Sequence, residues 1–241
     1  MKPTIRALLL GSAAGLVMTG AALAADLRGS ISPAPYYTNW SGFYAGVNGG
    51  YVFNWGRDAV LINDSFALHT EHEGGLFGGQ VGYHWQWTPE WVFGVETDLD
   101  WAGINGTANA GSAAAVQRIN SLGTLRGRAG YALENVLLYV TGGVAYGRTE
   151  LATSATLNGG CGPVGFCGSA ASTEWMIGWA AGAGFDWAFL PRWSFRTEYL
   201  HFDLGSRTQQ MTDVAAIPAT VDTSAAYRGD VVRGAINFKF R

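Results

Sequence analysis

Hydrophobic and polar residues alternate with a period of two along eight stretches of the chain. In the clearest stretch, one face carries Trp91, Phe93, Val95, Thr97, Leu99 and Trp101, and the other carries Gly94, Glu96, Asp98 and Asp100. A period of two is typical of a β-strand with one apolar and one polar face. We therefore predict eight strands, over residues 40–55, 76–87, 91–101, 119–133, 136–146, 174–189, 193–199 and 232–240.

One predicted hairpin occurs twice. Its marker residues Gly82, Trp85, Pro89, Trp91, Phe93 and Glu96 are matched by Gly184, Trp187, Pro191, Trp193, Phe195 and Glu198. Proline interrupts each copy where a tight turn is expected, because it cannot donate to a strand ladder. A unit that recurs after roughly 100 residues is too long for a solenoid and indicates one sheet built from similar hairpins.

The connections between the predicted strands alternate between short and long. Tight turns are predicted at 88–90, 134–135 and 190–192, and long polar loops at 56–74, 102–117, 148–172 and 205–226. This alternation is typical of outer-membrane barrels, which have short periplasmic turns and long external loops. With an even number of strands, both ends of the barrel are expected in the periplasm. The alternation also drifts after Leu200, which indicates a bulge.

The volume of the aromatic face decides which side meets lipid. An eight-stranded barrel has an interior just wide enough for its own side chains. Such an interior cannot hold the eight tryptophans of the apolar face together with their Phe and Tyr neighbours. The tryptophans are Trp85, Trp87, Trp91, Trp101, Trp175, Trp179, Trp187 and Trp193. We therefore expect the apolar face to point outward into a membrane, unlike the filled interior of a soluble exported barrel.

The first residues have the features of an export signal. Lys2 and Arg6 precede an apolar run that ends at the small residues Ala22-Leu23-Ala24. We predict a signal peptide over 1–24, a periplasmic leader over 25–39 with Pro-x-Pro spacing, and an all-β, eight-stranded antiparallel up-and-down transmembrane β-barrel over 40–241. The expected location is the cell outer membrane of a Gram-negative bacterium.

Composition agrees with this fold and narrows the function. The 241 residues include 35 glycines and 32 Trp, Tyr and Phe residues, and the 15 basic and 18 acidic residues give a net charge of −3. Small residues suit a crowded barrel interior and aromatic residues suit a lipid-facing wall. No Lys/Arg cluster is present in the sequence, so nucleic acid is not an expected partner.

Charged residues on the polar faces are the main candidates for a functional site. They are Glu96, Asp98, Asp100, Glu174, Asp186 and Glu198, with Arg126, Arg128, Arg196, Arg233 and Lys239. Buried charges persist only when they are paired. The near balance of signs predicts a salt-bridged plug through the lumen, and the alternative is a narrow, gated conduit lined by fixed charges.

Three further groups of residues are candidate sites. His69 and His72 could bind haem or a metal ion, but no third ligand is fixed near them. His84, or His201 with Asp203, could serve as a base, although a complete catalytic set is missing. Cys161 and Cys167 lie in a Gly/Pro-rich stretch and are predicted to form a short-loop disulfide, as expected after export. We expect no enzyme, no cofactor and no metal site.

Several motifs resemble a known group of proteins. They are Ala24-Ala-Asp-Leu27, Trp40-Ser-Gly-Phe-Tyr-Ala-Gly-Val-Asn-Gly-Gly-Tyr51, Leu138-Tyr-Val-Thr-Gly-Gly-Val-Ala-Tyr-Gly147, Trp193 to Leu204, and Val232-Arg-Gly-Ala-Ile-Asn-Phe-Lys-Phe240. Together they are similar to the small outer-membrane surface antigens of alphaproteobacteria, within the OmpA-like and opacity-protein-like eight-stranded barrels. One departure is Arg241, which follows the terminal aromatic residue that the assembly machinery usually reads.

The resemblance implies a structural outer-membrane protein with surface-exposed loops that contribute to envelope integrity and surface interactions. Its expected partners are outer-membrane lipid and lipopolysaccharide, the outer-membrane assembly machinery through the C-terminal strand, and host or surface ligands through the loops. The alternative functions are a narrow porin-like channel and a haem- or ligand-binding receptor.

Overall fold

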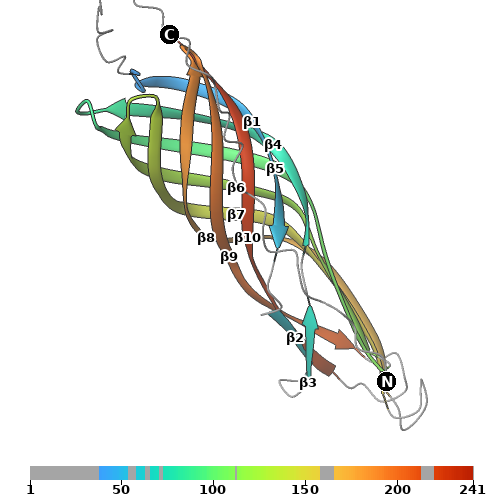
Figure 1. Cartoon of the computed structure of the whole chain (residues 1–241). Coiled ribbons are helices and arrows are strands. Elements are labelled where there is room, and N and C mark those ends of the chain that lie inside the picture. Colours follow the sequence, from blue (N-terminus) through green and yellow to red (C-terminus); the bar gives the residue numbers. More distant parts are fainter. Residues whose placement is uncertain are drawn as a thin grey trace, which may run out of the picture. The chain divides into compact units, whose positions relative to one another are not determined.

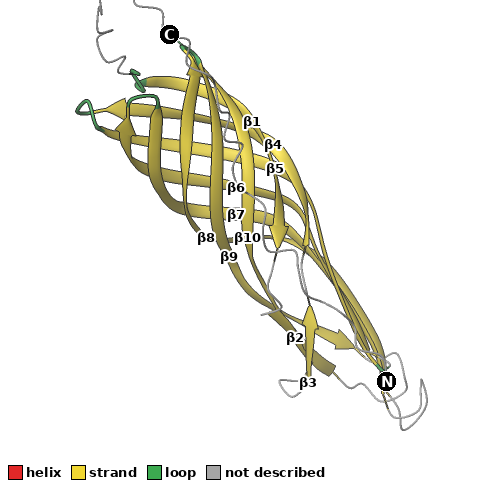
Figure 2. Cartoon of the chain, viewed as in Figure 1, coloured by secondary structure: helices red, strands yellow, loops and turns green. Residues whose placement is uncertain are grey.

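The computed structural model describes most of the chain beyond residue 37, and this part is built almost wholly of β-strands (Figure 2). The described ranges are 38–53, 58–62, 66–70, 73–111, 113–157, 166–212 and 220–240. Within them, no helix is long and apolar enough to cross a membrane. The predicted signal peptide lies outside the described residues, and so does the predicted leader apart from Thr38 and Asn39.

Eight long antiparallel strands form a closed ring, which confirms the predicted fold (Figure 1). They are β1 (Gly42–Phe53), β4 (Glu73–Gln86), β5 (Trp91–Ala110), β6 (Ala113–Leu133), β7 (Val136–Leu157), β8 (Phe166–Leu190), β9 (Trp193–Thr212) and β10 (Thr220–Lys239). Each strand pairs with the next, and β1 pairs with β10 from Tyr44↔Lys239 to Phe53↔Asp230 to close the ring. Closure leaves no free sheet edge at this level of the barrel.

The three tight turns are confirmed at one rim of the barrel. The strands on either side of them end and begin at Gln86 and Trp91, at Leu133 and Val136, and at Leu190 and Trp193. The start of β1 and the end of β10 lie at the same rim. We call this the periplasmic rim, because short turns face the periplasm in outer-membrane barrels.

The opposite ends of the strands correct the predicted loops. Most of the residues in 102–117, 148–172 and 205–226 belong to strands that continue well beyond the expected membrane span. Inside the predicted loop 56–74, β2 (Asp58–Ile62) and β3 (Phe66–Thr70) form a hairpin that pairs with β10 and lies at the end of the molecule away from the tight turns (Figure 1). Alternating Ala, Ser and Thr residues form these extensions, and their low hydrophobic contrast hid the strand pattern.

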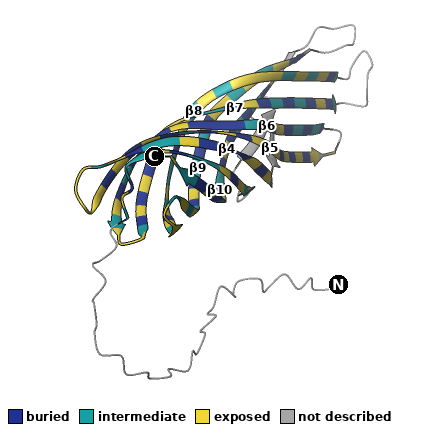
Figure 3. Ribbon diagram, turned by 90° about the horizontal axis from the view of Figure 1, so that it is seen from above, coloured by how far each residue is buried: buried dark blue, intermediate teal, exposed yellow. Residues whose placement is uncertain are grey.

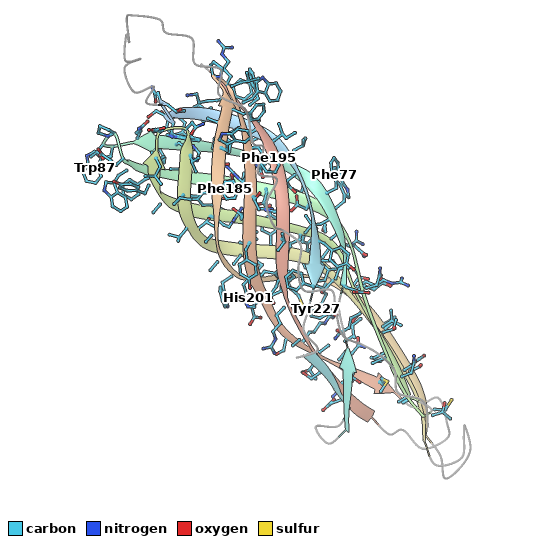
Figure 4. All side chains as sticks on the ribbon, viewed as in Figure 1. Phe77, Trp87, Phe185, Phe195, His201 and Tyr227 are labelled. Atoms are coloured by element: carbon cyan, nitrogen blue, oxygen red, sulfur yellow. The ribbon has the colours of Figure 1, made fainter. Side chains whose placement is uncertain are left out.

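The two faces of the wall differ as expected. Buried and exposed residues alternate along each strand (Figure 3). The eight tryptophans that were predicted to face lipid are all exposed on the outside of the barrel. Trp87 lies at the periplasmic rim, whereas His201 lies nearer the other end of the barrel (Figure 4). Trp91 and Phe93 stack beside Trp87, with ring centroids 6.5 Å apart, and this gives the girdle expected at a membrane boundary.

The lumen contains three layers along the barrel axis. At the periplasmic mouth, Trp40 packs on Val92 and Leu137. The next layer, which we call the waist, holds buried charged residues, namely Glu96, Asp98, Asp100, Arg126, Arg128, Asp186, Arg196, Glu198 and Arg233. Beyond it is an apolar outer layer, which includes Ile104, Ala108, Ala115, Ile119, Leu122, Leu151, Leu200, Phe202, Leu204 and Met211.

Side chains on β9 and β10 complete the outer layer. The predicted irregularity after Leu200 is confirmed as a bulge, because the register with β10 shifts between Ala226 and Arg228 and Gly205 has a φ of +85°. The β8–β9 ladder ends at Trp179↔Asp203. Tyr227 is buried in this layer, where burial raises the pKa of its phenol to about 12, and its hydroxyl donates to the backbone carbonyl of Glu150 at 3.3 Å.

Candidate functional site

The waist is built from one row of four residues that occurs twice. Strand register places Tyr44, Gly82, Glu96 and Arg126 side by side on β1, β4, β5 and β6. It places Tyr139, Gly184, Glu198 and Arg233 side by side on β7, β8, β9 and β10. The repeated hairpin in the sequence therefore supplies the glycine and the glutamate of each row, and the strands on either side supply the tyrosine and the arginine.

The glycine in each row makes space for the tyrosine. A Cβ atom on Gly82 would lie 2.4 Å from the hydroxyl of Tyr44, and a Cβ atom on Gly184 would lie 2.6 Å from that of Tyr139. Each tyrosine therefore lies across its glycine and reaches the glutamate beyond it. Its hydroxyl donates to the carboxylate, at 2.5 Å in the first row and 2.8 Å in the Tyr139 row.

Arg126 joins the two rows across the lumen. Its Nη2 donates to Glu96 Oε1 at 2.8 Å, and its Nη1 donates to Glu198 Oε1 at 2.9 Å. Arg233 Nη2 also donates to Glu198 Oε1, at 2.7 Å. Because Glu96 and Glu198 lie 102 positions apart on non-adjacent strands, these contacts connect opposite parts of the ring.

Two aspartates extend the network toward the outer layer. Asp98 Oδ2 accepts from Arg126 Nη2 at 2.9 Å, from Arg233 Nη2 at 2.8 Å and from the Thr124 hydroxyl at 2.7 Å. Asp100 Oδ2 accepts from Arg233 Nη1 at 3.2 Å. Arg233 thus bridges three carboxylates, on β5 and β9.

Two arginines extend the network toward the periplasmic mouth. Arg196 donates through Nε to Asp186 Oδ1 at 2.7 Å, and it also contacts Glu96. Arg128 Nη1 lies 3.3 Å from Glu96 and 3.5 Å from Asp186. The Arg128 guanidinium carbon lies 3.5 Å from the centroid of the Tyr139 ring, a cation–π contact that adds to the ion pairs.

Ion pairing offsets the free-energy cost of burying the charged side chains of the waist. The side chains of the waist ion pairs are 0–2 % exposed. An isolated charge transferred to such a site loses several kcal/mol or more of hydration, which good geometry and multiple hydrogen bonds offset. Five carboxylates and four guanidinium groups occupy this described layer, so nearly every charge has an opposite charge in contact. Such an arrangement connects strands that are not neighbours in the ring.

The periplasmic mouth is covered by Trp40. Its backbone N–H donates to Gln86 Oε1 at 2.8 Å, and its indole is buried against Val92 and Leu137. The recess beside it is small, about 30 Å³, which is room for about one water molecule. Trp40 precedes β1, which begins at Gly42 and not at residue 40 as predicted.

The structure brings the seven predicted network residues together; they are Glu96, Asp98, Arg126, Arg128, Arg196, Glu198 and Arg233. It also corrects two further assignments. Glu174 pairs with Arg207 in the outer extension, because it lies on β8 beyond the end of the β8–β9 ladder. Lys239 lies at the periplasmic rim, where it donates to the backbone carbonyl of Asn39.

The other candidates are not assembled as the sequence suggested. His201 Nδ1 lies 2.8 Å from Asp230 on the neighbouring strand, whereas Asp203 accepts from the backbone of Gly205. His84 is buried in the waist, with its ring centroid 4.6 Å from that of Tyr44. No group of three or more metal-binding side chains occurs among the described residues.

Two predicted sites fall where the structure gives no side-chain description. The side chain of His69 and the whole of His72 lie outside the described residues, and so does Cys161. The haem or metal site and the Cys161–Cys167 disulfide therefore stay predictions.

Sequence reasoning missed the role of the two tyrosines. The alternation of the sequence puts Tyr44 and Tyr139 on the inward face but assigns them no function. A signal was available, because each is a large aromatic residue on a face otherwise rich in glycine. The repeat alone could not reveal this, since the tyrosines lie on strands outside the repeated hairpin.

A closed ring of eight antiparallel strands, with an apolar aromatic outer face and a charged interior, defines an outer-membrane β-barrel. The chain belongs to the outer membrane protein β-barrel domain family, whose model matches residues 12–228. It is 31% identical to a 31 kDa outer-membrane immunogenic protein of Brucella melitensis over 98% of this chain and 100% of that protein. These findings place the protein in the outer membrane.

Two further comparisons agree with this family. The chain is 29% identical to a 22 kDa outer membrane protein of Rhizobium leguminosarum, over 70% of this chain and 66% of that protein. Its structure is similar to that of the outer membrane protein OprG from Pseudomonas aeruginosa, with a TM-score of 0.56 and 14% identity, over 85% of this chain and 99% of OprG. The likeness to OprG supports the fold alone.

Proposed function

We propose that the protein is a structural, non-enzymatic barrel that stabilises the outer membrane, closed across its lumen at the waist, with extended strands that present a surface outside the cell. The observation that carries this proposal is the burial of the waist ion pairs, whose side chains are at most 2 % exposed. An eight-stranded barrel leaves little interior volume, and here paired charges occupy it.

The same observation disfavours the alternative of a narrow channel. An ion crossing the waist would have to displace contacts such as Arg126–Glu96 and Arg126–Glu198. Breaking buried pairs costs several kcal/mol, which is a large barrier for a pore. No contact among the described residues favours the haem-receptor alternative.

The proposal extends to partners. The barrel lies in outer-membrane lipid, and lipopolysaccharide is the proposed partner of its outer half. Phe238 and Phe240, which contact each other at 5.4 Å between ring centroids, are proposed to be read by the assembly machinery together with the rest of β10. The related Brucella proteins are named immunogenic, and we infer that the extensions of this chain are likewise exposed to surface ligands.

Planar-bilayer recording of the refolded full chain tests the closed waist. We expect no steady openings in symmetrical salt, with membrane insertion checked by the heat-dependent gel shift of the folded barrel. Steady, ion-selective openings of the wild-type protein would refute the closed barrel and restore the channel interpretation.

A further inference from the structure

The outward face of the barrel carries no charged side chain between its two aromatic boundaries, within the strands that the structure describes. The outer boundary is marked by Tyr51, Phe77, Trp101, Tyr146, Trp175 and Trp179. Aromatic residues gather where hydrocarbon meets lipid headgroups. The first outward-facing charges past this line therefore lie at the depth of the headgroups of the outer leaflet.

Most of these first charges already have partners within the protein. Glu73 hydrogen-bonds Tyr51, and Asp230 accepts from the Tyr199 hydroxyl at 2.6 Å. Asp230 also contacts His201, as described above. Arg118 lies 4.0 Å from Glu150.

Arg148 on β7 differs from these residues. It is exposed and points outward, two positions beyond Tyr146, yet it has no ion pair or side-chain hydrogen bond within the described part of the chain. A guanidinium group at headgroup depth, with apolar wall below it, favours an anionic partner from the membrane.

The neighbours of Arg148 form a site around it. Strand register places Trp101, Ser121, Arg148 and Trp175 in one row across β5, β6, β7 and β8. The two indoles are 72 % and 62 % exposed and project toward lipid on either side of the arginine and serine. The row thus offers a forked cation, a hydroxyl group and two flat amphipathic rings on four neighbouring strands.

We propose that this row binds a phosphate group of an outer-leaflet lipid, which in the outer membrane is lipopolysaccharide. The Arg148 guanidinium takes two phosphate oxygens, because its planar fork matches phosphate geometry. The Ser121 hydroxyl donates to the same phosphate, and Trp101 and Trp175 pack against the adjoining acyl chains. This inference rests on the position of the barrel in the outer membrane and is independent of whether the waist is closed.

Titration of the folded full chain in detergent micelles with bisphosphorylated lipid A tests the site, with tryptophan fluorescence as the readout. We expect Arg148→Ala to weaken binding about tenfold, the loss expected for a charge-assisted hydrogen-bonded pair. Arg148→Lys should weaken it about threefold, because a point charge remains without the fork. Arg118→Ala is the matched control, because Arg118 on the neighbouring strand β6 is in register with Glu150, two positions beyond Arg148, and the substitution removes the same charge. It should change binding less than about twofold.

The probe itself separates a lipid site from a general anion site. Lipid A stripped of phosphate should bind the wild-type protein about as weakly as lipid A binds the Arg148→Ala variant, and inorganic phosphate at the same concentration should not displace lipid A. The proposal is wrong if Arg148→Ala binds like the wild type, if Arg118→Ala is equally weakened, or if stripped lipid A binds as tightly as lipid A. Heat-dependent gel shifts verify that each variant is folded, and a conducting wild-type barrel would leave this result unchanged.

Discussion

The waist and the outer layer fill the same lumen from the same strands, but they do so with opposite chemistry. On β9, the inward residues Arg196 and Glu198 belong to the waist, and the next inward residues, Leu200, Phe202 and Leu204, belong to the outer layer. In the waist each residue depends on partners of opposite charge, whereas in the outer layer each side chain contributes its own apolar burial. A single substitution should therefore affect several residues in the waist but mainly its own site in the outer layer.

Removing a charged group from the waist should have the largest effect on the free energy of unfolding. Glu96→Leu removes the carboxylate that Tyr44, Arg126, Arg128 and Arg196 contact. We expect a loss of about 3–5 kcal/mol in the free energy of unfolding, because buried guanidinium groups are left without a partner. Urea unfolding in phospholipid vesicles, followed by tryptophan fluorescence, measures it.

Glu90→Leu is the control for that variant, since Glu90 is an exposed glutamate in the β4–β5 turn. It should change the free energy of unfolding by less than about 0.5 kcal/mol. Equal stability of Glu96→Leu and Glu90→Leu would remove the distinction between the waist and an ordinary polar surface.

A cavity in the outer layer should have a somewhat smaller effect. Leu200→Ala deletes a side chain that is 1 % exposed in the apolar cluster. We expect a loss of about 3 kcal/mol, the usual cost of a buried leucine truncation. The same unfolding assay applies, and Leu125→Ala on the lipid-facing side of β6 is the comparison. A loss for Leu200→Ala no greater than for Leu125→Ala would contradict a packed outer layer.

Filling the space beneath a tyrosine should have the smallest of the three effects. Gly82→Ala forces Tyr44 away from Glu96, and Gly184→Ala crowds both Tyr139 and the backbone carbonyl of Thr197; we expect each to cost about 2 kcal/mol. Gly79→Ala is the control, because its Cβ would meet its nearest neighbour at 3.6 Å, an ordinary contact. If the two row glycines tolerate alanine as well as Gly79 does, the paired rows do not have the geometry described here.

The sequence predicted the membrane part of the barrel well because the contrast between faces is large there. Aromatic residues such as Trp91 alternate with glycine or charged residues such as Glu96, and prolines mark the turns. The starts of β5, β7 and β9 at Trp91, Val136 and Trp193 coincide with the predicted ones.

The outer extensions were missed because both of their faces carry small residues. On β5, Ala108 points into the outer layer and Thr107 points outward, and neither gives a strong hydrophobic signal. These strands are held by pairing with distant neighbours and by packing in the lumen, which sequence periodicity does not report. The charged members of the waist were predictable from their faces, but their partners were not, since contacts such as Arg126–Glu198 depend on closure of the ring.

A double-mutant cycle on Glu96 and Arg126 tests whether the waist acts as one paired network. We expect Glu96→Leu/Arg126→Leu to be more stable than the sum of the two single losses by about 2 kcal/mol, because each single variant strands a buried charge that the double variant removes. Losses that simply add, within about 0.5 kcal/mol, would contradict the network.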